Sequence, residues 1–90
     1  MNKQNLKRCA SKCFLCDITE YTLLDVHRIY EGEYGGTYEQ LNCLILCSNC
    51  HRLVHSKKII IIKKHKSYGV NLFLVEIITE NNRSFLPCNY

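Results

Sequence analysis

The chain has 90 residues, with 12 Lys and Arg against 8 Asp and Glu, and a formal net charge of +4. A chain of this length forms one domain whose apolar core alone gives only marginal stability, so an additional cross-link is expected. No apolar run approaches the roughly 20 residues that span a bilayer, and the first residues are polar and basic rather than a secretion signal. We therefore expect a soluble, intracellular (cytoplasmic) protein without a membrane partner. The mild positive charge favours contact with a polyanion without establishing one.

The N-terminal third predicts an arm, a tight loop and a strand. Residues 1–12 carry four Lys and Arg without apolar periodicity, which predicts a flexible or briefly helical basic arm. After a tight loop at residues 13–16, the β-branched and aliphatic residues 23–29 predict a strand. On that strand Asp25 and His27 would share one face, and Arg28 would lie on the other.

The central part predicts a loop, a second strand and a helix. Residues 31–37 contain three of the four glycines, which indicates a loop. Residues 42–46 predict a short strand. Ser48 and Asn49 are residue types that begin helices, so a helix should run from about Asn49 to Ser56.

The C-terminal part, residues 57–90, differs in composition. Two β-prone runs, Ile59–Ile62 and Val70–Ile78, are separated by the polar residues 63–69, which predicts a β-hairpin. Four consecutive isoleucines cannot all face water. The hairpin should therefore pack on the preceding module or on a second subunit, and its apolar strands suggest a homodimer.

Four of the seven cysteines form two Cys-x-x-Cys pairs about thirty residues apart. Thiols stay reduced inside cells, so this double pair indicates a tetrahedral zinc site rather than disulfides. One pair would lie in a loop and the other at the first turn of a helix, a treble-clef arrangement in which the positive helix end favours thiolates. We expect structural zinc at Cys13, Cys16, Cys47 and Cys50. Of the remaining cysteines, Cys43 suits a buried strand position.

His51 and His55 are four residues apart on the predicted helix and project from one face, where they could hold a second metal ion. Alternatively, one of them is a zinc ligand and the other is a surface histidine.

The order of the parts decides between these readings. His27 on a strand, Gly35-Gly36 in a loop, Asn42 on the next strand and Cys47-Ser48-Asn49-Cys50-His51-Arg52-Leu53-Val54-His55 follow one another. This order, over residues 13–55, resembles the HNH endonuclease family. The resemblance implies a zinc-stapled ββα-metal module at residues 13–56. The hairpin at 57–90 lies outside the resemblance, and the two parts together predict an α+β fold. The resemblance further implies hydrolysis of phosphodiester bonds, usually in DNA, with one catalytic divalent cation beside the structural zinc. We expect Mg²⁺ or Mn²⁺ as that cation.

The resemblance also implies roles for individual residues. His27 would activate water, since imidazole titrates near neutrality. Asn42 would tie the two strands together and hold His27 in position. His51, His55 or both would bind the cation, and Asp25 would assist from the face it shares with His27. Four basic residues would contact nucleic acid or form a solvated basic face: Arg28, Arg52, Lys57 and Lys58.

The chain departs from the family at Arg28, where many members place the base. An arginine cannot act as a base at ordinary pH. If the register is set by Asn42, His27 can be the base; if it is set by Gly35-Gly36, His27 aligns with a metal ligand. The second register leaves a substitute base (Tyr30, Tyr34 or Tyr38) or a domain that binds without cleaving.

A non-catalytic zinc module that binds nucleic acid or protein is therefore the alternative function. A small-molecule enzyme is disfavoured, because so short a chain cannot build a large apolar pocket.

Overall fold

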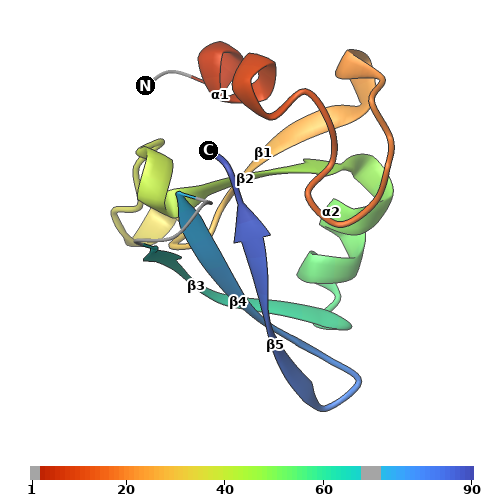
Figure 1. Ribbon diagram of the computed structural model, residues 1–90, viewed down its shortest axis with the longest axis vertical. Coiled ribbons are helices and arrows are strands. Elements are labelled where there is room, and N and C mark those ends of the chain that lie inside the picture. The colour runs from red at the N-terminus through yellow and green to blue at the C-terminus, as the bar shows by residue number, and fades with distance from the viewer. Residues whose placement is uncertain (1–2, 68–71) are drawn as a thin grey trace.

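The computed structural model describes residues 3–67 and 72–90 (Figure 1). Two helices and two antiparallel sheets make up this part of the chain, so the expected α+β class is confirmed. The elements are α1 (Lys3–Ala10), β1 (Leu24–Arg28), β2 (Cys43–Cys47), α2 (Ser48–His55), β3 (Ile59–Lys66), β4 (Phe73–Thr79) and β5 (Asn82–Cys88). One-turn 3-10 helices lie at Tyr21–Leu23, Gly32–Tyr34 and Gln40–Asn42. Within the described residues, no helix is long and apolar enough to cross a membrane.

Strands β1 and β2 form an antiparallel pair that leads directly into α2. Leu24 pairs with Cys47 and Arg28 with Cys43, so the strands and the helix lie within one residue of their predicted bounds. Every side chain of β2 is buried. Cys47 ends β2 and is also the N-cap of α2, where its sulfur accepts a hydrogen bond from the Cys50 N–H.

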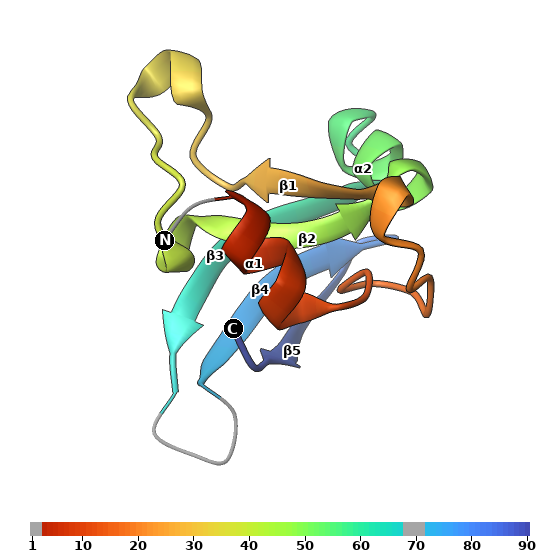
Figure 2. The same ribbon diagram turned by 90° about the horizontal axis from the view of Figure 1, so that it is seen from above.

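Helix α1 covers the outer side of the β1–β2 pair, and the C-terminal sheet lies on the other side (Figures 1 and 2). We expected residues 1–12 to form a flexible or briefly helical arm. Residues 3–10 form α1, in agreement with the helical alternative, and its Leu6 side chain is 0% exposed in a core shared with Leu24 and Ile45. One buried leucine thus anchors a segment that has too few apolar residues to show a helical pattern.

The two predicted strands of the C-terminal region pair antiparallel as β3 and β4, but a third strand that was not predicted, β5, extends them to a three-stranded sheet in the order β3-β4-β5. Residues 63–66, expected to link two strands, continue β3, while Val70 and Asn71 lie outside the described residues. The missed strand, β5, contains Pro87, which an edge strand tolerates. It follows β4 through the two-residue turn Glu80–Asn81, where both φ angles are positive.

The C-terminal sheet packs on the rest of the protein through β2. Leu44 of β2 joins a core cluster with Phe73, Val75, Ile77 and Cys88. Lys64 is 2% exposed, because its Nζ donates to the carbonyls of Gln40 and Cys43 at 2.6 and 3.0 Å. The Tyr90 hydroxyl accepts a hydrogen bond from the Ile45 N–H. These contacts join β3 and Tyr90 to β2 and to the residues that directly precede it.

Candidate metal centres

The four cysteines of the two Cys-x-x-Cys pairs come together as expected. Their sulfur atoms all lie within 4.8 Å of one another, and the Sγ atoms of Cys16 and Cys47 are 3.6 Å apart. Tetrahedral zinc with Zn–S bonds near 2.3 Å places its sulfurs about 3.8 Å apart. All seven cysteines, each within the described part of the chain, are unbridged. The cluster could therefore hold a structural zinc.

Local structure builds both halves of this cluster. The Cys13 N–H donates to the Ile18 carbonyl, which closes the first loop, and Phe14 N–H donates to the Ile45 carbonyl, which fixes that loop to β2. Burial would raise the pKa of Cys47, but hydrogen bonds from the Cys50 N–H and the neighbouring thiols bring it down to about 7. Burial and the neighbouring thiols raise the pKa of Cys50. The group thus favours a thiolate at the N-terminus of α2, the form in which cysteine binds metal.

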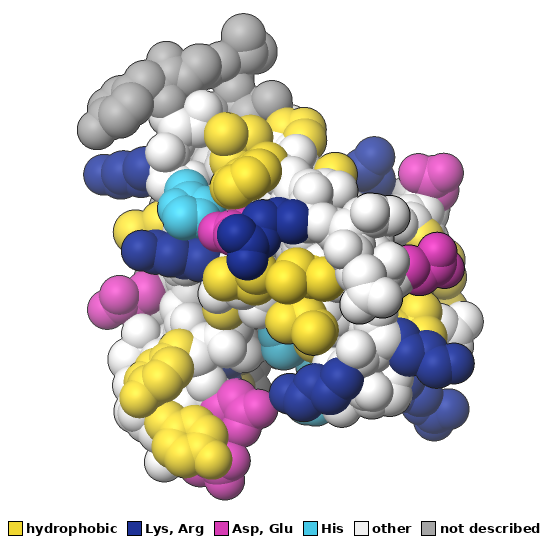
Figure 3. Space-filling view, turned by 90° about the horizontal axis from the view of Figure 1, so that it is seen from below, with side chains coloured by type: hydrophobic (Ala, Val, Ile, Leu, Met, Phe, Trp, Pro, Cys, Tyr) yellow, Lys and Arg dark blue, Asp and Glu magenta, His cyan; other side chains and the backbone are white. Residues whose placement is uncertain are grey.

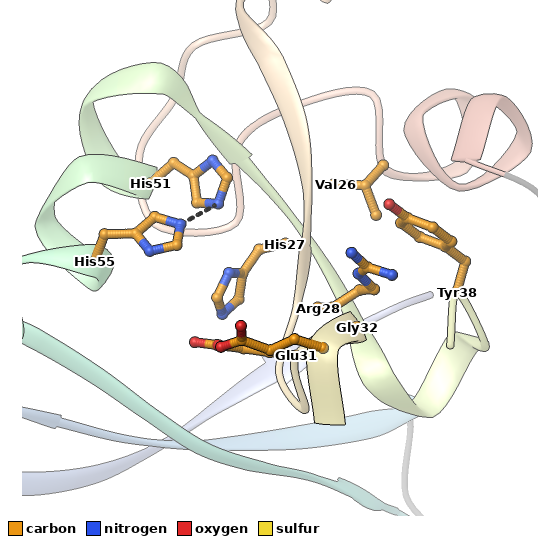
Figure 4. Close-up of a pocket in the computed structure, with 9 residues that line it drawn as sticks. Val26, His27, Arg28, Glu31, Gly32, Tyr38, His51 and His55 are labelled. Carbon is orange, nitrogen blue, oxygen red and sulfur yellow. Dashed lines mark hydrogen bonds between the residues drawn. The ribbon is translucent and has the colours of Figure 1, made fainter. Parts of the chain in front are cut away.

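The three histidines His27, His51 and His55 form a second cluster. One ring nitrogen of each lies within 4.8 Å of the others, and the Nε2 atoms of His51 and His55 are 3.1 Å apart (Figure 4). Imidazoles bound tetrahedrally at about 2.05 Å would place these atoms about 3.3 Å apart. His51 and His55 come from adjacent turns of α2, and His27 comes from β1. This second cluster could also hold a metal ion.

Asp25 fixes the orientation of His51. Its Oδ2 lies 3.4 Å from Nδ1 of His51, so Nδ1 can carry the proton while Nε2 faces the other two rings. A carboxylate on the outer nitrogen of a histidine commonly orients that histidine toward a metal. The strand alternation predicted from the sequence accounts for this, since Asp25 and His27 share one face of β1.

His27 is the most buried of the three rings, with 9% of its surface exposed. Burial, together with the positive charges that His51 and His55 acquire on protonation, lowers the pKa of His27 to about 4. His27 is therefore neutral at pH 7, which leaves a nitrogen lone pair available to a cation.

Asn42 closes the loop that follows β1. Its Oδ1 accepts from the Tyr30 N–H at 2.7 Å, and its Nδ2 donates to the carbonyls of Tyr30 and Thr37 at 3.0 and 2.8 Å. Its carbonyl also accepts from the Ile29 N–H, two residues beyond His27. Gly36 passes so close to the Tyr30 carbonyl that a Cβ there would overlap it. The loop is thus folded back beside the histidines.

A cavity of about 440 Å³ opens beside the three histidines (Figure 4). Arg28, Glu31, Glu33 and Tyr38 line it as well. Glu31 extends toward His27, and its negative charge raises the pKa of that ring, against the larger effects of burial and the other histidines. The motifs gave no signal for Glu31 or Glu33, because the folded loop, not a fixed spacing, brings them to the histidines.

The other predicted nucleic-acid residues lie on or after α2. Arg52 is exposed on the helix next to His51, Lys58 is exposed after it, and Lys57 is close enough for its charge to lower the pKa of His27 slightly. Lys57 and Lys58 line a second cavity together with Leu53 and residues of β3 and β4. Basic charge therefore lies beside the histidine cluster.

Comparison of the chain with protein-family models, with curated proteins and with solved structures gives no match. The resemblance to HNH endonucleases thus rests on the residues of this chain alone.

Proposed function

We propose that the protein is a metal-dependent endonuclease that hydrolyses phosphodiester bonds in DNA. In this proposal residues 13–56 form a treble-clef ββα-metal module, with structural zinc at the four cysteines and a catalytic cation at the histidines. The convergence of His27, His51 and His55 in an open cavity, separate from the cysteines, carries the proposal. A purely structural zinc module has no need of a second, solvent-open ligand set.

The donor set bears on the identity of the cation. Imidazole nitrogen suits zinc, copper, iron and nickel, whereas Mg²⁺ prefers oxygen ligands and water. Three imidazoles therefore favour a transition-metal ion over Mg²⁺. When bound, such a cation stabilises the negative charge that builds on the phosphate and the leaving oxygen.

Each nearby residue then has a defined task. His27 acts as a ligand rather than as the base, because its ring lies with the other two histidines and its lowered pKa makes it a weak proton acceptor. Asp25 holds His51 in the tautomer that presents Nε2. Glu31 accepts a proton from the attacking water, whose oxygen forms the new bond to phosphorus. The bond from phosphorus to the sugar oxygen breaks, and solvent protonates that oxygen.

One observation favours the alternative, a non-catalytic zinc module that binds nucleic acid. If all three histidines are ligands, no imidazole is left as a base, and Arg28 stands where many relatives of the HNH type place one. The two functions differ in whether the phosphodiester is cut.

Plasmid nicking distinguishes the endonuclease from the non-catalytic module. It is measured with zinc-loaded protein, with and without Mn²⁺, Co²⁺ or Mg²⁺. We expect cation-dependent nicking that His27→Ala and His51→Ala abolish. His65→Ala is the matched control, because His65 lies on β3 and pairs with Glu76, outside the cluster. Folded, zinc-bound wild-type protein that binds DNA but nicks none of it with any cation would establish the alternative.

A further inference from the structure

Arg28 follows His27 on β1, and its side chain lies on the opposite side of the strand from the three histidines (Figure 4). It nevertheless lines the same cavity, which continues around the unpaired edge of β1. Among the residues that the structure describes, no carboxylate lies within 4.0 Å of its guanidinium. A cationic group is thus held at the cavity without a counter-ion.

Two neighbours hold the guanidinium in place. It stacks on the ring of Tyr38, with Cζ 4.4 Å from the ring centroid. Its other contact is Gly32, where an added Cβ would overlap the guanidinium. Glycine at this position lets the loop approach Arg28 closely. Stacking on Tyr38 and close approach to Gly32 already restrict the side-chain rotamers of Arg28. Binding a ligand therefore costs less side-chain entropy here than at a mobile surface arginine.

A planar, fixed guanidinium without a counter-ion suits a phosphate, to which it donates two parallel hydrogen bonds. Glu31 and Glu33 line the same cavity and repel anions. Within this cavity a phosphate is therefore favoured at the cation among the histidines and at Arg28. Because His27 and Arg28 are consecutive and point to opposite faces, one strand could occupy both places with two of its phosphates.

We propose that Arg28, positioned by Tyr38 and Gly32, binds a phosphate that flanks the one held at the histidine cluster. The substrate is then a strand with at least two phosphates, rather than a mononucleotide or a small diester. This inference rests on the proposed function, because it takes the histidine cluster as the site of the reacting phosphate.

The test is equilibrium binding of two phosphorothioate oligothymidylates, which keep the backbone charge and resist hydrolysis. One has a single linkage and the other has four; both are measured with zinc-loaded protein and Mn²⁺. We expect Arg28→Ala to weaken binding of the longer strand about tenfold or more, and binding of the single linkage less than twofold. Gly32→Ala should weaken binding of the longer strand in the same way while Arg28 remains.

Arg83→Ala is the matched control, because Arg83 lies on β5 and pairs with Glu76. Thermal melting checks that each variant is folded. The inference is overturned if wild-type protein does not bind the longer strand, or if Arg28→Ala weakens binding of both strands equally or of neither. Plasmid nicking is measured separately. If the nuclease proposal fails, the wild-type protein does not nick; if the Arg28 proposal fails, nicking remains and only the binding result differs from the one expected.

Discussion

Glu31 is the residue whose proposed role depends most on the folded loop. It lies four residues after His27, too far along the chain for a strand spacing to link the two, and reaches the cavity because the loop turns back at Gly36. Glu33 lines the same cavity with the same charge. Replacing either glutamate by glutamine removes the same charge from the cavity, so the two variants can be compared directly.

If Glu31 accepts the proton of the attacking water, Glu31→Gln should lower the rate of nicking about a hundredfold, as loss of a general base commonly does. Glu33→Gln should lower it only a few-fold. The cleavage rate of a labelled duplex, measured at saturating Mn²⁺, reports the difference. Equal cleavage rates for the two variants would show that Glu31 is not the general base.

Sequence spacing predicted the four cysteines of the zinc site and the shared face of His51 and His55. The place of His27 beside them was implied only by the resemblance, as the base or, in the other register, as a metal ligand. A Cys-x-x-Cys loop brings two sulfurs together, and residues four apart on a helix share a face. Asp25 and His27 shared a face because strand residues alternate. Glu31 and the stacking of Arg28 on Tyr38 were not predictable in this way, since both require the three-dimensional course of residues 30–38.

The side chain of Asn42 holds the loop between β1 and β2 closed. Asn42 makes three hydrogen bonds to Tyr30 and Thr37. Its role was expected to be a tie between the two strands that holds His27. Asn42 directly precedes β2, and its side chain and backbone bond to Tyr30 and Ile29, which directly follow β1, so it joins the two strands where the loop begins and ends. A role in holding His27 stays a prediction.

Asn42→Ala should therefore open the loop and lower the free energy of unfolding by about 1–3 kcal/mol, since it removes three exposed hydrogen bonds that are each worth roughly 0.5–1.5 kcal/mol or less in net terms. Asn42→Asp keeps the acceptor and loses the donor, so it should retain part of the stability. Chemical denaturation of zinc-loaded protein measures both. A change below about 0.5 kcal/mol in Asn42→Ala would show that the loop holds without this side chain.

The C-terminal strands show where element prediction failed. The pattern of β3 and β4 was visible because isoleucine, valine and leucine dominate them. β5 has the sequence NRSFLPC, with no β-branched residue, and owes its place to the turn at Glu80–Asn81 and to pairing with β4. Hydrogen bonding to β4 thus makes residues 82–88 a strand although their intrinsic β propensity is weak.

On the scale of the whole molecule, the outer side of the C-terminal sheet remains partly apolar. Ile60 is 41% exposed and Phe85 is 54% exposed, and Figure 3 shows hydrophobic side chains gathered in patches between charged ones. Homodimerisation through this region remains a prediction. Light scattering coupled to sizing should give twice the chain mass, and Phe85→Ser should halve it. A wild-type mass of one chain would count against the dimer.

One helix joins the two candidate metal centres. Cys47 caps α2 and Cys50 lies in its first turn, while His51 and His55 project from the same helix toward His27. Zinc at the cysteines would fix the start of α2 and so place the two histidines. Binding at small zinc sites is worth roughly 10–16 kcal/mol, enough to replace a larger core in a chain of this size.

The proposed nuclease requires two separate metal ions, one at the cysteines and one at the histidines. Native mass spectrometry of protein loaded with Zn²⁺ and Mn²⁺ counts them directly. We predict two ions per chain in the wild type and in His65→Ala, and one in His51→Ala. A single ion in the wild type, with the same count in His51→Ala, would contradict the second site and with it the nuclease proposal.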